Sequence, residues 1–445
     1  MAAISSAAYV RLRSCSRGSS HVAWYVNTGG YLNNNNANNS YAAQPDCACQ
    51  SPGKRAAHSA AARGEYDTRS PALPSGKQRA ADAIGVRPGI AVHGRQFYQM
   101  DEENIIGYEA LWDSMMKCKR GVIWKDSVAN FVLNGVSEIA KLSDELHSGE
   151  YRERPHRYFT IKYPKEREIM SISFRDRVYQ RCLNDVAIYP VMSRSFIYDN
   201  CACQKGKGSD FARQRLKCHI QRYYRRHGAD GYVLKLDVRK YYDSMLHDTA
   251  KALFRQRLPE NVYQRAAAIL DGFPGGMGFN PGSQIIQILG ISLPDRIDHY
   301  AKERLRIKHY IRYMDDTVIL GRTRAELETV RDELARKYDA LGLSLHDEKS
   351  TIAPLRQGVR FLGYHYRLTD TGKVVMSADP DRLKATRCKY RRLAAKCKAG
   401  KISRAKVDES YQCWRECASK GDGRRMLWNM DKYYQSLWKG GEAFD

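Results

Sequence analysis

The sequence predicts an α+β fold that follows a disordered N-terminal extension. Residues 1–99 are rich in Ala, Ser, Asn, Gly and Arg and have no sustained apolar period, a composition that buries too little apolar surface to fold. From about residue 104, apolar residues recur at helical spacing, and shorter segments alternate apolar and polar residues as strands do. Helices and strands therefore share one folded region behind the extension.

The chain is strongly basic. Its 445 residues include 74 Lys+Arg against 49 Asp+Glu, a formal net charge of +25 at pH 7. Such a surplus attracts polyanions, most often nucleic acid, although a merely cationic surface would have the same composition. We therefore expect a nucleic-acid partner.

Neither a membrane protein nor a zinc protein is indicated. No window holds the 18 or more consecutive apolar residues that a membrane-spanning helix needs. The 12 cysteines are scattered, and the tightest sets have no partner pair at zinc-finger spacing. Reduced thiols are typical of a cytoplasmic protein, and the basic, acid-free N-terminus is only weakly similar to a transit peptide. We expect a cytoplasmic location and no membrane contact.

Periodicity predicts the first elements of the folded region. Apolar residues at helical spacing predict helices over residues 105–118 and 125–149, the second ending at Gly149. A strand is predicted over 157–165. A further helix is predicted over 173–192, ending near Pro190 because proline lacks an amide hydrogen.

Three aspartates stand where apolar strands end. Residues 232–236 alternate as a strand and lead directly to Asp237, whereas Asp315 and Asp316 lie at the turn of a predicted hairpin over 309–321. Taken singly, each aspartate has an ordinary structural explanation as a helix cap or a surface turn. Adjacent carboxylates repel one another, so a hydrophobic strand pair needs a compensating cation there. The three could hold two Mg²⁺ ions, with Mn²⁺ as the alternative.

Several sequence motifs resemble those of a known family. The YMDD box at residues 313–316 resembles the catalytic box of reverse transcriptases, and the order of motifs is similar to theirs from about residue 104 onward. FRDRVYQRCL, FIYDNCACQKGKGSD, LDVRKYYD, GLSLHDEKST and RFLGY are the segments that carry the similarity. The resemblance implies a right-hand polymerase with fingers, palm and thumb, and RNA-directed DNA polymerase activity.

The same resemblance divides the chain. Residues 1–99 would be the extension, 100–230 the N-terminal helices and fingers, 231–375 the palm, and 376–445 a basic helical thumb that grips the phosphates of an RNA–cDNA duplex. The partners implied are template RNA, primer or cDNA, and dNTPs.

The resemblance also assigns roles to residues of the catalytic box and its partner strand. Asp237, Asp315 and Asp316 would be catalytic and would bind the metal ions. Tyr313 and Met314 would belong to the nucleotide-binding site.

Outside the box, the assigned roles compete with structural ones. Tyr242, five residues after Asp237, stands where the family places an aromatic gate against a ribose 2′-hydroxyl, although a core tyrosine is the alternative. Lys349 stands at the family's lysine position, where it could protonate the departing pyrophosphate, or it could simply be solvated. Arg175 and Arg177 are candidate phosphate contacts in the fingers, but a basic helix face explains them equally well.

Two lysines next to glycines are further candidates for the nucleotide-binding site. Lys205 and Lys207, set beside Gly206 and Gly208, could contact the triphosphate or the template. A family arginine usually stands where this chain has Gln204, so the phosphate contact is open.

A glycine-rich turn before an apolar helix fits the family's nucleotide pocket in either of two frames. We favour the frame from Gly282 to Gln287, which keeps the family spacing and places Ile286 where the family has serine. The other frame uses Ser283 and Gln284. Both depart from the family pattern.

The segment WYVNTGGYLNNNNANNS, residues 24–40, resembles a template repeat of a diversity-generating retroelement read as protein. Those elements copy a template RNA with errors at adenines, and asparagine codons are adenine-rich. The bland alternative is a low-complexity linker. On the first reading we expect the working polymerase to start near Met100.

The resemblance within the class points to a diversity-generating reverse transcriptase, which works with an accessory variability determinant protein. A retron or phage-defence reverse transcriptase shares the catalytic boxes and is the main alternative. A group II intron protein would add domains for which this chain has no cysteine and histidine sets. A non-catalytic RNA-binding protein on a polymerase scaffold would be expected to lack the aspartates.

Overall fold

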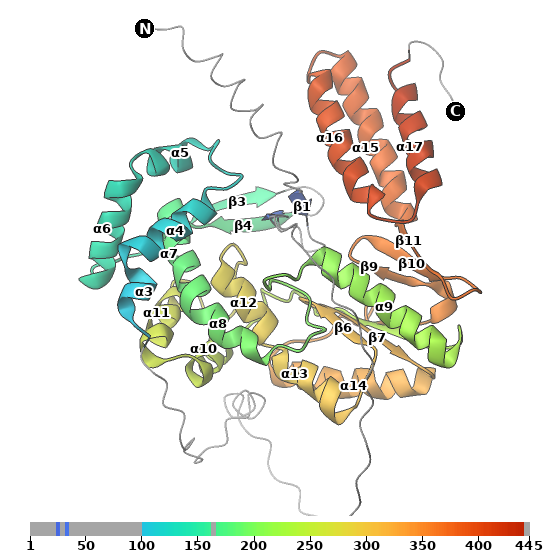
Figure 1. Cartoon of the computed structure of the whole chain (residues 1–445), viewed down its shortest axis with the longest axis horizontal. Coiled ribbons are helices and arrows are strands. Elements are labelled where there is room, and N and C mark those ends of the chain that lie inside the picture. The colour runs from blue at the N-terminus through green and yellow to red at the C-terminus, as the bar shows by residue number, and fades with distance from the viewer. Residues whose placement is uncertain (1–23, 27–31, 35–99, 162–165, 440–445) are drawn as a thin grey trace, which may run out of the picture.

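The computed structural model describes residues 24–26, 32–34, 100–161 and 166–439 (Figure 1). The expected disorder of the N-terminal extension therefore lies almost wholly outside the described residues. Two short pieces of it are described: β1 (Trp24–Val26) and β2 (Leu32–Asn34) pair as antiparallel strands. Both fall in the Asn-rich segment, where no strand was expected.

The described residues confirm an α+β fold. Four helices begin the folded region: α3 (Glu102–Ile106), α4 (Tyr108–Cys118), α5 (Asp126–Leu133) and α6 (Gly135–His147). The sequence predicted two longer helices, and each is interrupted. Gly107, at φ −64° and ψ 157°, divides the first, and Asn134, at φ −96° and ψ 22°, divides the second. Both residue types favour helix ends over interiors, yet the apolar spacing continues across each break.

A two-stranded hairpin follows. β3 (Arg157–Ile161) confirms the first part of the predicted strand and pairs antiparallel with β4 (Arg167–Ser171), which the sequence did not predict. The next helix has three parts: α7 (Phe174–Leu183), a π-helical turn (Asn184–Ile188) and α8 (Tyr189–Met192). The predicted end near Pro190 is slightly early, because Pro190 falls in the first turn of α8, where its missing N–H costs little.

A four-stranded antiparallel sheet lies at the centre of the molecule, in the order β6-β7-β5-β8. Its strands are β5 (Tyr232–Leu236), β6 (Tyr310–Tyr313), β7 (Asp316–Gly321) and β8 (Thr351–Pro354). Helix α9 (Ser209–His227) packs on β6, and α14 (Arg324–Ala340) packs on β5, β7 and β8 (Figure 1). These helices therefore cover the strands of the sheet, and the packing fixes the positions of the loops at the strand ends.

Four more helices complete this body: α10 (His247–Arg257), α11 (Glu260–Asp271), α12 (Gln284–Ser292) and α13 (Asp295–His299). One continuous hydrophobic core joins the first helices, from Ile105, to the last sheet, at Met376. None of the described helices is long and apolar enough to cross a membrane.

The C-terminal part has a sheet and a bundle of its own (Figure 1). The elements are β9 (Val359–Phe361), β10 (Tyr364–Leu368), β11 (Val374–Ala378), α15 (Pro380–Lys398), α16 (Arg404–Ser419) and α17 (Arg424–Ser436). A separate core around Tyr390, Tyr411 and Tyr434 holds the three helices together. The rings of Tyr411 and Tyr434 stack 3.8 Å apart, and their hydroxyls donate to Asp431 and Asp408.

Two ion pairs fix the base of this bundle to α9. Lys217 Nζ lies 3.4 Å from Asp422 Oδ2, and Lys420 Nζ lies 2.7 Å from Asp210 Oδ2. Asp422 also accepts a hydrogen bond from the Met376 amide at 2.9 Å. The loop between α16 and α17 therefore connects the bundle, β11 and α9.

Candidate active site

The predicted hairpin is confirmed. β6 and β7 pair antiparallel, and Tyr313 pairs with Asp316 across a two-residue turn. Met314 in that turn has φ +57°, a left-handed conformation that is costly for a side chain of its size. Tyr313 and Met314 are buried and Asp315 is half-buried, so the turn is held tightly and does not project into solvent.

The sheet register brings the third aspartate to the same place. Leu236 pairs with Thr317, so Asp237, which follows β5, lies beside Asp316 at the same end of the sheet. Burial, followed by repulsion from Asp316 and Asp237, raises the pKa of Asp315 from 3.8 to about 7. Burial and the Asp237 charge also raise the pKa of Asp316. The three predicted carboxylates thus form one cluster with an excess of negative charge.

Two lysines partly neutralise this cluster. Lys235 Nζ lies 3.2 Å from Asp316 Oδ1, and Lys349 Nζ lies 3.3 Å from Asp237 Oδ2. Lys349 is brought there by a loop whose His346 amide donates to the Asp237 carbonyl at 2.7 Å. Lys349 was predicted for this site and Lys235 was not. The period of two in β5 carried the signal, since Lys235 and Asp237 share one face of the strand.

The donor set fits a hard divalent cation in chemistry. Within the described ranges, no three Asp, Glu, His or Cys side chains are arranged to hold a metal ion. Asp316 and Asp237 each have one oxygen within 3.2 and 3.3 Å, respectively, of a lysine Nζ. Carboxylate oxygens are nevertheless the ligands that Mg²⁺ prefers. A cation between them would offset the carboxylate repulsion and the cost of burying the charge, the two effects that raise the pKa of Asp315.

A buried arginine that sequence reasoning missed supports the turn. Arg312 is fully buried and forms a two-pronged ion pair with Asp298, with Nε–Oδ1 at 2.7 Å and Nη2–Oδ2 at 2.6 Å. Its Nη1 donates to the Met314 carbonyl at 2.9 Å. Nη2 also donates to the Ile291 carbonyl at 2.9 Å. Arg312 thereby connects the turn between β6 and β7 to α12 and α13. In the sequence it is only one more residue of a short strand.

The predicted aromatic gate lies against the turn. The Tyr242 hydroxyl is 3.7 Å from Met314 Sδ, and its ring packs on Gly290 of α12. A Cβ at Gly290 would lie 2.7 Å from the Tyr242 hydroxyl and 3.0 Å from two ring carbons. The Tyr241 hydroxyl donates to the Gly290 carbonyl. Gly290 therefore determines where both tyrosines stand.

Both frames of the glycine-rich turn lie at the start of α12. Gln287 Nε2 donates to the Pro281 carbonyl at 3.2 Å, whereas Gln284 Oε1 is buried with no hydrogen-bond partner among the described residues. Ser283 caps the helix by accepting from the Ile285 amide. Gly282 is exposed, and a Cβ there would lie 3.3 Å from the Met170 carbonyl of β4. Both glutamines thus stay candidates for the nucleotide pocket.

The predicted cations of the fingers differ in their surroundings. Lys205 is exposed, with Nζ 5.2 Å from the centre of the Tyr189 ring. Lys207 Nζ donates to the carbonyls of Tyr198 and Asn200 at 3.0 Å each, and burial lowers its pKa. Lys205 is thus free for a phosphate, whereas Lys207 would first have to leave these carbonyls.

Arg175 is surrounded by protein. Its guanidinium pairs with Glu145 and with Asp176, and it lies 4.8 Å from the centre of the Tyr151 ring. Only 5% of the residue is exposed. This geometry is that of a structural ion pair, in place of the expected phosphate contact. The neighbouring Arg177 is half-buried, and its Nε has no partner within the described residues.

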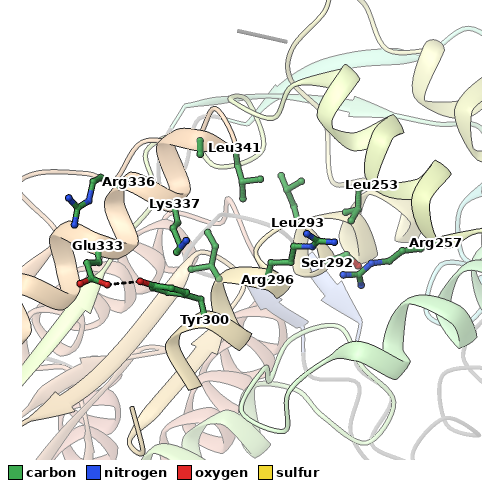
Figure 2. A pocket seen from close by; sticks show the side chains of 12 residues that line it. Leu253, Arg257, Ser292, Leu293, Arg296, Tyr300, Glu333, Arg336, Lys337 and Leu341 are labelled. Carbon is green, nitrogen blue, oxygen red and sulfur yellow. Dashed lines mark hydrogen bonds between the residues drawn. The ribbon is translucent and has the colours of Figure 1, made fainter. Parts of the chain in front are cut away.

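A cavity lies apart from the predicted site residues. It has a volume of about 600 Å³ and is lined by α10, α14 and the segment from Ser292 to Tyr300. Figure 2 shows Tyr300 donating to Glu333, with Arg296 and Lys337 beside them. None of the predicted site residues lines it.

The chain was compared with known proteins. Residues 162–366 match the family model described as reverse transcriptase (RNA-dependent DNA polymerase). No curated protein sequence matches significantly. Among solved structures, telomerase from Candida albicans in complex with a fragment of telomeric RNA is similar, with 11% sequence identity and a TM-score of 0.41. That match covers 70% of this chain, which spans only 60% of the telomerase chain.

The matched segment includes the whole four-stranded sheet and all three aspartates. The right-hand polymerase fold expected from the motif order is thereby confirmed. The similarity to the reverse transcriptase family is thus carried by residues 162–366 of this chain.

Proposed function

We propose that this protein is an RNA-directed DNA polymerase that makes cDNA on an RNA template from a primer and dNTPs. The supporting observation is the carboxylate cluster of Asp237, Asp315 and Asp316, at adjacent strand ends of a domain that matches the reverse transcriptase family. Buried carboxylates with raised pKa cluster at functional sites, because such an arrangement is costly to folding alone.

Each residue of the site has a distinct part in the proposed reaction. Two Mg²⁺ ions, with Mn²⁺ as the alternative, held by the three aspartates would lower the pKa of the attacking 3′-hydroxyl and stabilise the departing pyrophosphate. Lys235 and Lys349 hold the carboxylates in the free protein. Lys349 is half-exposed, and on leaving Asp237 it would be free to donate a proton to the pyrophosphate. Arg312 keeps the turn in place.

The test is primer extension on an RNA template with purified protein and Mg²⁺. Wild-type protein should make cDNA, and Asp315→Asn together with Asp316→Asn should abolish it, because amides bind hard cations weakly. Asp370→Asn, an exposed change outside the site, is the matched control and should leave cDNA synthesis unchanged. Equal synthesis by wild type and the double variant would exclude the proposed active site.

Within this class, we propose that the polymerase belongs to a diversity-generating retroelement and works with an accessory variability determinant protein. What supports this is the sequence of residues 24–40, which resembles a template repeat read as protein, placed ahead of the polymerase domain. The cDNA made with the accessory protein present should carry substitutions concentrated at template adenines. Accurate cDNA would favour a retron or phage-defence enzyme instead.

A further inference from the structure

A basic site, separate from the aspartate cluster, lies at the C-terminal half of α9. Its cavity has a volume of about 520 Å³ and a wall of only basic side chains: Arg215, His219, Arg222, Arg225, Arg226, Lys308 and His309. We call this set the basic pocket. It is separated from the catalytic turn by the length of β6, about 13 Å of strand between His309 and Tyr313.

Little of this charge is neutralised by the protein. Asp199, beneath the pocket, pairs with Arg215 at 2.5 Å, His219 at 3.0 Å and Lys302 at 2.7 Å. These contacts offset positive charge on the inner side of the pocket. On the outer side, no carboxylate of the described residues lines the pocket.

The outer cations are unpaired. The side chains of Arg222, Arg225, Arg226 and Lys308 are exposed and form no hydrogen bond or ion pair with any described residue. Burial, followed by the charges of His219, Lys302, His227 and Arg226, lowers the pKa of the nearby His309 to about 4. A polyanion is the partner that such an arrangement attracts.

Helix stability alone does not explain this charge. Cations in a last turn are favourable because they face the negative end of the helix dipole, which would account for Arg225 and Arg226. Arg222 lies one turn earlier and Arg215 three turns earlier. Over its length α9 has six Lys or Arg against one Asp, whereas α14, which flanks the same sheet, has four against five. The excess is therefore specific to α9.

The spacing and the lining identify the kind of partner. Arg215 and Arg226 are eleven residues apart on α9, a rise of about 16 Å, so a single small anion would contact only part of the set. Membrane-binding surfaces need apolar side chains beside the basic ones, and protein interfaces need an apolar centre, but this wall has neither. A chain of phosphates fits all of these observations.

We propose that the basic pocket binds the phosphate backbone of RNA, as a second contact outside the catalytic cluster. The choice of RNA over DNA rests on the proposed polymerase function, since a template RNA is the long polyanion such an enzyme must retain. Phosphate contacts of this kind fix position without reading sequence. The pocket would therefore hold template RNA of any sequence against the palm.

The experiment measures RNA binding separately from polymerisation. The full chain with Asp315→Asn and Asp316→Asn is titrated with fluorescent single-stranded RNA over a series of salt concentrations, with and without Arg222→Gln, Arg225→Gln and Arg226→Gln. The pocket variant should bind at least about tenfold more weakly, and its slope of log affinity against log salt should fall by about two, from the loss of three phosphate contacts. Restoring the charge with Lys at the three positions should restore the slope.

A matched variant removes three exposed arginines near α14: Arg322→Gln, Arg324→Gln and Arg336→Gln. It has the same change in net charge and should bind RNA nearly as wild type does. Thermal unfolding would establish that each protein is folded. Equal loss in both variants would reduce the effect to net charge and overturn the proposal, as would unchanged affinity in the pocket variant. Stronger retention by anionic vesicles than by RNA would point to a membrane and overturn it too.

Failure of the polymerase proposal would look different. If wild-type protein made no cDNA but its RNA binding still depended on the three α9 arginines, the basic pocket would stand and the catalytic assignment would fall. On a short template–primer that cannot extend beyond the catalytic cluster, the pocket variant should keep wild-type primer extension.

Discussion

At the residue scale, Tyr242 is held by one glycine, and this contact makes its role testable. Tyr242→Ala should increase the use of ribonucleotides relative to deoxyribonucleotides by about 10- to 200-fold, the range that one steric group in a pocket supplies. The measurement is the ratio of kcat/KM for a matched rNTP and dNTP. Tyr232→Ala, at a half-buried tyrosine at the far end of β5, should not change this ratio. A ratio that Tyr242→Ala also leaves unchanged would make Tyr242 a packing residue.

Gly290→Ala tests the same contact from the other side. The added methyl would lie 2.7 Å from the Tyr242 hydroxyl, so the ring must move from its place beside Met314. A displacement of about 1 Å at a reacting site costs up to about 100-fold in rate, so kcat/KM for dNTPs should fall by about 10- to 100-fold. Because Tyr242→Ala removes the clashing ring, adding it should restore most of the loss. Failure of this rescue would place the effect of Gly290 elsewhere.

Arg312 leads to a stability prediction. Arg312→Met leaves Asp298 as an unpaired carboxylate in the core, which should lower the free energy of unfolding by about 3–5 kcal/mol. Asp298→Asn added to Arg312→Met removes that stranded charge and should recover part of the loss. Urea denaturation of the two variants and wild type is the measurement. Equal stability of the single variant and wild type would contradict the buried pair.

The carboxylate cluster was easier to predict than the residues that hold it in place. Asp237, Asp315 and Asp316 stand at strand ends with no packing reason to be there, and that conflict is visible in the sequence. Arg312 sits in an apolar strand and pairs with Asp298, but nothing in the spacing links two residues joined only by the fold. The prediction that Arg175 contacts phosphate differs from the structure for a related reason. Its partner Glu145 belongs to a different helix, so the sequence does not show the ion pair.

At the element scale, periodicity found the helices but not their breaks. The apolar face continues across Gly107 and Asn134, because both halves of each pair pack on the same core. The hairpin of β6 and β7 was predicted almost to the residue, since its turn and both strands are local. β4 was missed because it has little apolar alternation and pairs with β3, a mostly exposed strand.

The contact between α9 and β6 leads to a pH prediction. The pKa of His309 is lowered from 6.5 to about 4 by burial and by the charges of His219, Lys302, His227 and Arg226. In that interval the unfolded chain binds protons that the folded chain refuses, so the free energy of unfolding should fall as the pH is lowered from about 6.5 to 4. Above pH 6.5 this contribution is complete. Urea denaturation at several pH values should show a flatter profile for His309→Gln.

The tryptophans of the helical bundle differ in their surroundings. Trp414 and Trp438 pack against the tyrosine core, but Trp428 is 56% exposed, with Lys432 Nζ 3.6 Å from its ring centre. An exposed ring beside a lysine on a basic bundle is suited to stacking on nucleic acid. Trp428→Ala should therefore weaken binding of an RNA–DNA duplex without lowering thermal stability. A fall in stability with duplex affinity unchanged would return Trp428 to a packing role.

At the scale of the whole molecule, the main body, whose core extends from Ile105 to Met376, and the C-terminal bundle have separate cores. Their relative position therefore depends on few contacts. The ion pairs Lys217–Asp422 and Lys420–Asp210 are two of them. Exposed pairs of this kind contribute about 0.2–1 kcal/mol each, enough to shift a loosely held bundle but not to unfold it. The bundle should therefore respond to their loss by gripping the duplex less well.

The expected result is lower processivity. With a trap that captures released enzyme, Lys217→Gln plus Lys420→Gln should give shorter cDNA per binding event, while the rate of adding one nucleotide stays unchanged. Asp210→Asn plus Asp422→Asn distinguishes this from loss of phosphate contacts. If the two lysines bound phosphate, removing the aspartates would free them and lengthen the cDNA, but if they hold the bundle to α9, both double variants shorten it. Because salt screens exposed pairs, the difference from wild type should narrow as ionic strength rises.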